Sequence, residues 1–240
     1  MERLDKIIAA SSERSRREVK QLVREGRVFV NGMIARSAEE KVEAETAEIV
    51  IDGAPLRFRR FVYLMLNKPA GVQSATEDGH GCTVLDLLPE AYRKRGVFPV
   101  GRLDKDTEGL LLLTDDGALA HELLSPKKHV DKVYYARLDG TLTQADCDAF
   151  AAGLTLGVGL RCLPAGLTIL SAGRESEALI TLREGKFHQV KRMAAARGKP
   201  VLYLKRVRMG PLELDEKLPS GAWRELTEEE CSALHRSYNG

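Results

Sequence analysis

Four consecutive leucines at residues 110–113 constrain the fold more than any other stretch of the sequence. They lie between Gly109 and Gly117, and an apolar run this short between turn-forming residues is typical of a buried strand rather than a helix. The residues just before the run are polar, so Arg102 and Asp104 are expected on a loop that the strand holds in place. Reactive side chains are often found on such loops.

Residues 101–117, GRLDKDTEGLLLLTDDG, allow three interpretations. The first is a solvated surface turn. The second is a calcium loop, because the alternating acids of residues 104–108 repeat the first half of an EF-hand and Asp115 falls at its twelfth position. The leucines would fill the middle of that loop, however, and the preceding KRGVFPV (94–100) is typical of a strand rather than a helix. Calcium is therefore disfavoured.

The third interpretation rests on the whole pattern GRLD-x-DT-x-GLLL-x-TDDG, which closely resembles the catalytic-aspartate motif of pseudouridine synthases. The resemblance implies that Asp104 is the essential catalytic residue. Whether Asp104 attacks the ribose or removes a proton from it stays open. Arg102 is expected to fill the space that a flipped nucleotide leaves. The neighbouring acids Asp106, Asp115 and Asp116 are interpreted as turn and helix-cap residues.

Lys132-Val133-Tyr134 resembles the basic-x-Tyr element of the same family. The resemblance implies that Tyr134 stacks on the target base and that Lys132 contacts the substrate. A planar ring tolerates a turning uracil, and base stacking is worth roughly 1–3 kcal/mol. A second tyrosine follows, so Tyr135 remains the alternative stacking ring, and a role in the strand core remains the alternative for both.

Residues 184–193, EGKFHQVKRM, resemble the third motif of the family, and HQVKRM is especially similar to its small-subunit rRNA (RsuA-type) branch. In that motif a basic residue pairs with the catalytic aspartate and keeps it ionised, as an opposite charge within a few ångströms does. Lys191 aligns best with this role and Arg192 second. The motif residues expected to bind substrate are Lys186, His188, Gln189 and Arg192. Without the other motifs, an amphipathic helix with a solvated face would explain this stretch.

The first 55 residues predict a helix over 3–10, a second helix after Ser15, a hairpin at Asn31-Gly32 and a strand over 48–53. This order resembles the small RNA-binding module named after the fourth small-subunit ribosomal protein. The resemblance implies RNA binding without naming a reaction. A basic exposed helix face can contact RNA backbone without reading bases, and here that face would present Arg16, Arg17, Lys20 and Arg24.

We predict two domains, a small α/β RNA-binding domain over 1–58 and a catalytic domain over 59–240, joined by a short basic linker at 55–60. Few β-α-β repeats occur in the second part, so we expect an α+β fold with a mixed, largely antiparallel sheet and flanking helices. Residues 83–90, TVLDLLPE, predict a short helix that ends near Pro89.

Lysine and arginine are unevenly distributed although the net charge is only +2. Residues 183–208 hold nine against one acid, and residues 1–36 hold nine against five. Two basic regions suggest two contact surfaces for a polyanion. Two solvated faces are the alternative, and composition alone would favour them.

Composition also disfavours several classes of protein. The four cysteines and five histidines lack zinc-site spacings, so no metal is expected and the thiols should be reduced, as in the cytoplasm. No apolar run reaches the length of a membrane span. The first ten residues carry acids and lack the apolar segment of a signal peptide.

These observations together favour the cofactor-independent isomerisation of a specific uridine to pseudouridine in 16S, small-subunit rRNA. We expect a cytoplasmic monomer whose partner is ribosomal RNA or an assembly intermediate. The alternatives are a synthase of the sister branch that modifies large-subunit rRNA and a noncatalytic RNA-binding ribosome-assembly factor. An RNA methyltransferase is disfavoured because no glycine-rich cofactor loop follows an early strand.

Overall fold

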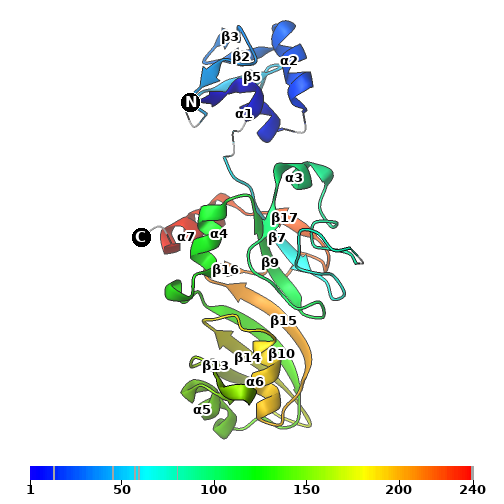
Figure 1. The fold of residues 1–240 in the computed structure, drawn as a ribbon, viewed down its shortest axis with the longest axis vertical. Coiled ribbons are helices and arrows are strands. Elements are labelled where there is room, and N and C mark those ends of the chain that lie inside the picture. The colour runs from blue at the N-terminus through cyan, green and yellow to red at the C-terminus, as the bar shows by residue number, and fades with distance from the viewer. Residues whose placement is uncertain (13, 45, 57, 59, 80, 239–240) are drawn as a thin grey trace. The chain divides into compact units, whose positions relative to one another are not determined.

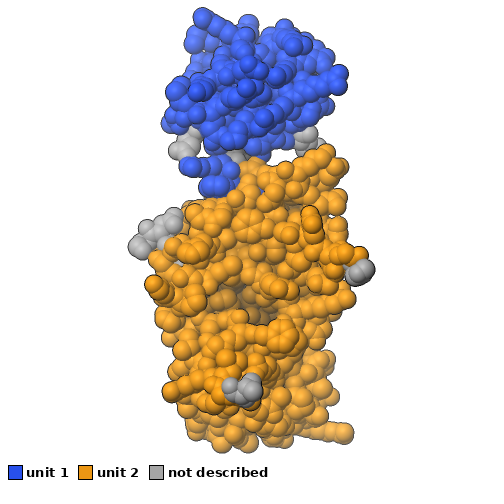
Figure 2. Space-filling view, in the orientation of Figure 1, with its two compact units in different colours: residues 1–62 blue, residues 63–240 orange. Residues whose placement is uncertain are grey.

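The computed structural model divides into two compact units, residues 1–62 (unit 1) and residues 63–240 (unit 2), shown in different colours in Figure 2. Each unit has its own hydrophobic core. The structure describes residues 1–12, 14–44, 46–56, 58, 60–79 and 81–238. Arg57 and Arg59 of the predicted linker, and His80, lie outside the described residues. The assignment of one role to each domain stays a prediction.

Unit 1 packs two helices against short strands (Figure 1). Strands β3, β2, β5 and β6 form one antiparallel sheet in that order, and β1 pairs with β4. The core includes the helical residues that the sequence spacing places on one face, namely Leu4, Ile7, Ile8, Val19, Leu22 and Val23. The elements are β1 (Glu2–Arg3), α1 (Leu4–Ala10), α2 (Arg16–Arg24), β2 (Val28–Val30), β3 (Met33–Ile34), β4 (Lys41–Val42), β5 (Ile49–Ile51) and β6 (Ala54–Pro55).

Two local sequence signals of unit 1 are confirmed. At the start of α2, Ser15 N donates to Glu18 Oε2 at 2.6 Å while Glu18 N donates to Ser15 Oγ at 3.3 Å, which is the predicted capping box. Between β2 and β3, Asn31 and Gly32 have φ values of 50° and 78°, as a two-residue hairpin turn requires.

Unit 2 is built on a nine-stranded sheet of the described residues, with the strand order β13-β14-β10-β15-β9-β7-β17 and with β16 and β8 paired to β15 and β9. Its larger elements are β7 (Tyr63–Lys68), α3 (Glu90–Arg95), β9 (Glu108–Thr114), α4 (Gly117–Leu124), β10 (Lys132–Asp139), α5 (Gln144–Ala152), β13 (Gly166–Ser171), β14 (Glu175–Leu182), α6 (Gln189–Ala196), β15 (Val201–Met209) and α7 (Glu228–Tyr238). Its short elements are β8 (Phe98–Pro99), η1 (Pro126–Lys128), β11 (Thr155–Leu156), η2 (Gly157–Gly159), β12 (Leu160–Arg161), β16 (Leu212–Glu213) and β17 (Trp223–Glu225).

The sheet confirms the predicted α+β class. Its pairings are antiparallel except for β15 with β9, which is parallel. Helices α4 and α7 lie beside the half that contains β7 and β9, whereas α6 lies over the half that contains β10 and β14 (Figure 1). The leucine run forms the buried part of β9, as predicted. In the described part of the chain, no helix is both long and apolar enough to cross a membrane.

The two halves of the sheet meet at the parallel contact between β15 and β9, here called the seam. It consists of the residue pairs Lys205–Glu108 and Arg206–Gly109. Gly109 has φ +99°, and a Cβ at this position would overlap the carbonyl oxygen of Arg206. The Arg206 side chain is only 2% exposed, and its Nε donates to the Leu110 carbonyl oxygen at 2.8 Å. The seam therefore needs a glycine on one strand, and the buried arginine on the other strand spans it.

The predicted helix over 83–90 is wrong, because residues 84–87 form turns and α3 begins only at Glu90. Thr83 N and Oγ1 both donate to Asp86 Oδ2, at 2.8 and 2.9 Å. The backbone on either side of Thr83 is bonded to Gln73, through Gln73 N to Cys82 O at 3.0 Å and Val84 N to Gln73 O at 2.9 Å. A hydrogen bond between a side chain and a nearby backbone group, such as that between Asp86 and Thr83 N, competes with the hydrogen bonds of a helix.

The predicted strand over 94–100 is also mostly wrong. Lys94 belongs to α3, where it pairs with Glu90 one turn earlier at 2.9 Å. Gly96, with φ 82°, then ends the helix in the left-handed conformation that favours glycine. Only Phe98 and Pro99 are left to form strand β8.

Candidate active site

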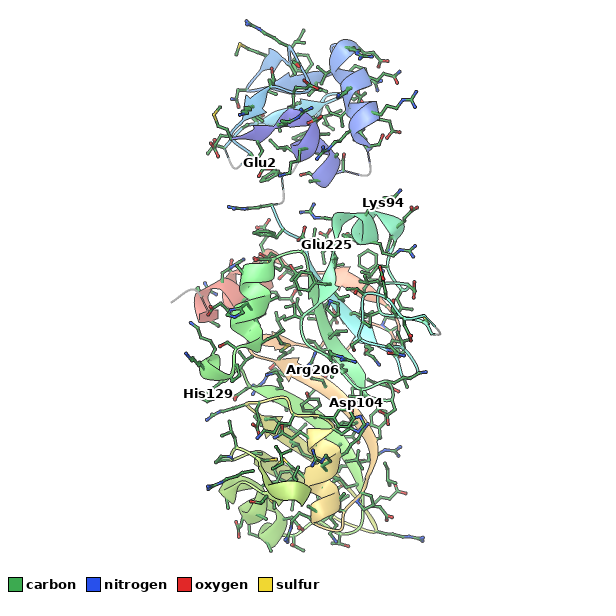
Figure 3. The ribbon with its side chains drawn as sticks, viewed as in Figure 1. Glu2, Lys94, Asp104, His129, Arg206 and Glu225 are labelled. Carbon is green, nitrogen blue, oxygen red and sulfur yellow. The ribbon has the colours of Figure 1, made fainter. Side chains whose placement is uncertain are left out.

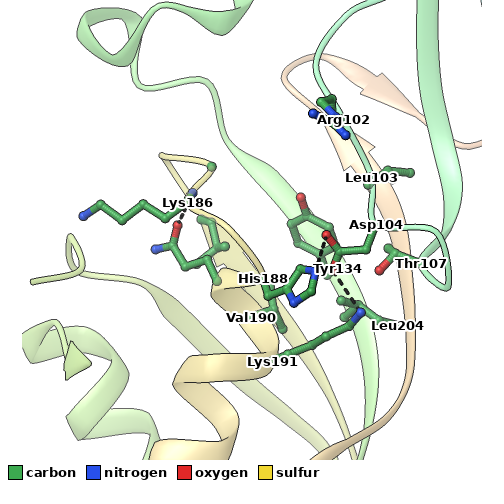
Figure 4. A pocket seen from close by; sticks show the side chains of 13 residues that line it. Arg102, Leu103, Asp104, Thr107, Tyr134, Lys186, His188, Val190, Lys191 and Leu204 are labelled. Carbon is green, nitrogen blue, oxygen red and sulfur yellow. Dashed lines mark hydrogen bonds and ion pairs between the residues drawn. The ribbon is translucent and has the colours of Figure 1, made fainter. Parts of the chain in front are cut away.

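Three polar side chains from distant parts of the chain meet at one cavity of unit 2 (Figure 4). Asp104 lies on the loop before β9, Tyr134 on β10 and Lys191 on α6. Asp104 and Arg206 both lie in the middle of the unit (Figure 3). The cavity is lined by Arg102, Leu103, Asp104, Thr107, Tyr134, Leu182, Gly185, Lys186, His188, Gln189, Val190, Lys191 and Leu204.

Asp104 is held between two basic groups of the α6 segment. Lys191 Nζ lies 2.9 Å from Asp104 Oδ2, and His188 Nε2 lies 3.6 Å from Asp104 Oδ1. The Asp104 side chain is 26% exposed, so the carboxylate is partly shielded from water yet open to a ligand. Lys191, not Arg192, forms this ion pair, and Arg192 is not among the described residues that line the cavity.

The Lys191 ammonium is shared with a second carboxylate, at 2.5 Å from Asp106 Oδ1. Burial disfavours the ammonium, but hydrogen bonds to Asp106 and Asp104 outweigh this effect and raise the pKa of Lys191 above its ordinary value. The hydrogen bond from Lys191 lowers the pKa of Asp106 in turn. A protein ammonium thus occupies the place between the two acids, which further disfavours a calcium loop.

Tyr134 and Tyr135 point to opposite faces of β10, because side chains alternate along a strand. Tyr134 is 9% exposed and lines the cavity beside Asp104 (Figure 4). Tyr135 instead meets Tyr203 edge to face, with ring centroids 6.1 Å apart. Among the described residues that line the cavity, Tyr134 is present and Tyr135 is not, so Tyr134 is the ring that can contact a ligand there.

The loop that carries Asp104 is fixed by Lys68, a residue that the sequence did not single out. Lys68 is fully buried at the end of β7, and its Nζ donates to the carbonyl oxygens of Pro69 (2.9 Å), Lys105 (3.2 Å) and Thr107 (2.9 Å). Burial lowers the pKa of Lys68 to about 8, although the nearby carboxylates oppose this shift. On the other side of Asp104, Ser74 Oγ accepts from Leu103 N at 3.1 Å.

The sequence profile of the family described as RNA pseudouridylate synthase matches residues 62–196, more than half of the chain. The chain belongs to this family. Its cavity is therefore the candidate active site of an RNA pseudouridine synthase. The resemblance that the motifs carry is confirmed, and an S4 domain profile matches residues 2–48.

The relatives of this synthase match it over almost its whole length. An uncharacterised RNA pseudouridine synthase of Bacillus subtilis is 47% identical and covers 97% of this chain and 98% of its own. A ribosomal small subunit pseudouridine synthase A of Vibrio cholerae is 40% identical and covers 97% of this chain and 99% of its own. A crystal structure of a pseudouridylate synthase has a TM-score of 0.67 and 36% identity, over 98% of this chain and all of the other.

Two of the predicted substrate-binding residues in the synthase hold its own loop together. Gln189 is buried, and its side chain accepts from Lys186 N at 2.9 Å and donates to Glu184 Oε1 at 2.6 Å. Lys186 Nζ pairs with Glu184 at 2.9 Å. Both residues line the cavity, as do Arg102 and His188. Their contacts with a substrate stay predictions.

Lys132 is not among the described residues that line the cavity. Its Nζ donates to the Val130 carbonyl oxygen at 3.1 Å. Burial, and then the nearby Arg206, lower the pKa of Lys132 to about 8. The predicted contact between Lys132 and the substrate remains a prediction.

Replacing Lys68 by Met is expected to slow the synthase through the position of Asp104. The carbonyl oxygens of Pro69 and Thr107 would lose the lysine donor, whereas that of Lys105 keeps Gly71 N as a donor at 2.8 Å. We therefore expect a loss of about 2–4 kcal/mol of unfolding free energy. Turnover should fall roughly 10²-fold, because a misplaced reactive group costs about that much. Urea unfolding and single-turnover rates on RNA measure the two effects. The matched control is Lys105→Met, which removes an exposed lysine from the same loop. Unchanged turnover in a folded Lys68→Met protein would contradict the positioning role.

Proposed function

We propose that the protein converts a specific uridine of small-subunit (16S) rRNA to pseudouridine without a cofactor, in the cytoplasm, with Asp104 as the catalytic carboxylate. The observation that carries the proposal is the Asp104–Lys191 ion pair beside the Tyr134 ring in a single cavity. The choice of RNA is supported by the Vibrio cholerae relative, which is named a ribosomal small subunit pseudouridine synthase A. The HQVKRM segment supports the same choice.

The reaction breaks the bond between ribose C1′ and uracil N1, turns the base, and forms a bond between C1′ and C5. The proton on C5 is lost and N1 gains one, so atoms and electrons balance within the substrate and no redox partner is required. Asp104 can attack the ribose as a nucleophile or remove a proton from it as a base. Both roles require the ionised carboxylate, which the Lys191 ammonium at 2.9 Å favours.

Tyr134 would bind the target base, and Arg102 would fill the space that this base leaves in the RNA. A base that is released from the sugar must stay in the site while it turns, and the flat Tyr134 ring can stack on it in either orientation. Arg102 is exposed at the cavity and extends from the loop that carries Asp104 (Figure 4). Its side chain would replace the flipped nucleotide in the RNA and so offset part of the cost of unstacking.

A comparison of pseudouridines in rRNA from strains with and without the protein tests the proposal. We expect one small-subunit position to lose its pseudouridine. Wild-type protein should restore it, and the Asp104→Asn variant should not. Loss of a large-subunit pseudouridine instead would assign the protein to the sister branch, and no change in any rRNA position would contradict the proposal.

Unit 1 is proposed to bind RNA backbone through the exposed face of α2. Arg16, Arg17 and Arg24 are exposed there, while the opposite face of the helix is buried in the core of unit 1. Lys20 lies 3.2 Å from Glu39 and is already partly neutralised. The three arginines are therefore the side chains of α2 best placed to meet phosphates.

Replacing Arg16, Arg17 and Arg24 together by Gln should weaken RNA binding and reduce its salt dependence. Each phosphate contact adds about 0.7–0.9 to the slope of log affinity against log salt, so the slope should flatten by roughly 2–3. Binding titrations with an rRNA fragment at several salt concentrations measure it. The control is Arg36→Gln, which removes an exposed arginine outside α2. A slope that the triple variant leaves unchanged would show that α2 does not contact phosphates.

A further inference from the structure

Phe187 is an aromatic side chain that the fold leaves in solvent beside the active site. It is 76% exposed, although a phenylalanine is among the residue types most often buried. One face of its ring stacks on the His188 imidazole, with ring centroids 3.8 Å apart and an interplanar angle of 18°. Most of the remaining ring surface is therefore available to a ligand.

The backbone, rather than the Phe187 ring itself, determines this exposed position. His188 has φ 49° and ψ 36°, a left-handed conformation that is uncommon for a residue other than glycine. The buried Gln189 side chain is bonded to Lys186 N and Glu184 Oε1, which fixes the loop on either side of the ring. The loop conformation thus depends on buried groups that Phe187 does not supply.

The Phe187–His188 stack extends outward from the catalytic carboxylate. His188 Nε2 lies 3.6 Å from Asp104 Oδ1, and the imidazole lines the cavity. The Phe187 ring therefore contacts His188, a side chain that itself lies beside Asp104.

We propose that Phe187 is the platform on which the base next to the target uridine stacks. The inference rests on the proposed RNA substrate. When the target base leaves its helix, its neighbour loses a stacking partner, and an exposed aromatic ring can replace that partner. The chain around Phe187 is also basic, with four lysines and arginines against one acid over residues 183–192. Aromatic rings among cations are typical of surfaces that bind single-stranded RNA.

The test compares Phe187→Ala and Phe187→Trp on the rRNA fragment whose uridine the strain comparison identifies. For Phe187→Ala we expect the half-saturating RNA concentration to rise about 5- to 150-fold, the range of one lost base stack, and to change more than the maximal rate does. Phe187→Trp keeps a flat ring and should remain close to wild type. The control is Leu170→Ala on β13, which removes another exposed apolar side chain, one that is 52% exposed.

Abasic nucleotides identify the partner of the ring. RNA that lacks the base on one side of the target should bind wild-type protein and Phe187→Ala equally, whereas RNA that lacks the base on the other side should still distinguish them. If Phe187→Ala binds intact RNA as wild type does, or if its defect persists with both abasic RNAs, the proposal is overturned. Thermal unfolding should be nearly unchanged in Phe187→Ala, because the ring buries little surface, and a large drop would assign the ring to the fold.

A second measurement separates this inference from the proposed rRNA target. Tryptophan fluorescence of Phe187→Trp should be quenched by a short oligouridylate, beyond the signal of the single native Trp223. If wild-type protein fails to convert the small-subunit fragment while quenching is observed, the target is wrong and the platform stands. If no quenching occurs although wild-type protein converts the fragment, the platform is wrong and the target stands.

Discussion

Replacing Asp104 by Asn is expected to reduce pseudouridine formation by at least roughly 10³-fold, because the amide can act neither as a nucleophile nor as a base. RNA affinity should stay within a few-fold of wild type, since a single carboxylate contributes no attraction to phosphates. Lys191 would keep its bond to Asp106 Oδ1, so the fold of the site should persist. Single-turnover conversion and a binding titration on the same RNA measure both quantities.

Asp106→Asn is the matched control for this experiment. Asp106 pairs with the same lysine, but its side chain is 73% exposed and it is not among the described residues that line the cavity. An exposed ion pair is worth about 0–1 kcal/mol, so the rate should fall by no more than about 5-fold. If Asp104→Asn still converts uridine at a rate similar to that of Asp106→Asn, Asp104 is not the catalytic carboxylate.

Replacing Lys191 by Met is expected to lower the rate roughly 10- to 100-fold. The physical reason is that Asp104 loses the ammonium that lies 2.9 Å from it and that holds the carboxylate in place. In the wild type, the raised pKa of Lys191 keeps the ammonium charged through the neutral range.

Arg192→Met is the comparison for Lys191→Met. Neighbouring residues on a helix point about 100° apart, so Lys191 and Arg192 contact different groups. Arg192→Met should mainly weaken RNA binding and leave the rate at saturation unchanged. Both rates should be recorded under saturating, single-turnover conditions. A rate that falls only in Arg192→Met would assign the pairing role to Arg192.

The elements that local sequence predicts well are those stabilised by neighbouring residues. The Ser15–Glu18 capping box and the Asn31-Gly32 turn each depend on groups a few residues apart, and each forms as expected. The helix predicted over 83–90 fails for two reasons. Thr83 bonds to the Asp86 side chain, and the backbone around Thr83 bonds to Gln73, ten residues earlier. The bonds to Gln73 cannot be predicted from residues 83–90 alone.

The candidate site was only partly predictable, for a related reason. The motif resemblance predicts Asp104, Tyr134 and Lys191, and strand alternation together with the ion pair distinguishes them from Tyr135 and Arg192. The role of Lys68 could not be predicted because its partners are backbone carbonyl oxygens, which every residue has. The one indication in the sequence was the position of this lysine at the end of an apolar strand.

The seam has a consequence for how the rate can change during evolution. Asp104 comes from the half of the sheet with β9, whereas Tyr134 and Lys191 come from the half with β10 and α6. Among the described residues, the backbone ladder between β15 and β9 consists of two residue pairs. A small change in sheet curvature, caused by a substitution far from the RNA, therefore alters the separation of the carboxylate from the ring and the ammonium. Relatives with identical reactive residues can therefore differ in turnover rate. Laboratory selection for a higher turnover rate should find substitutions in β9 and β15.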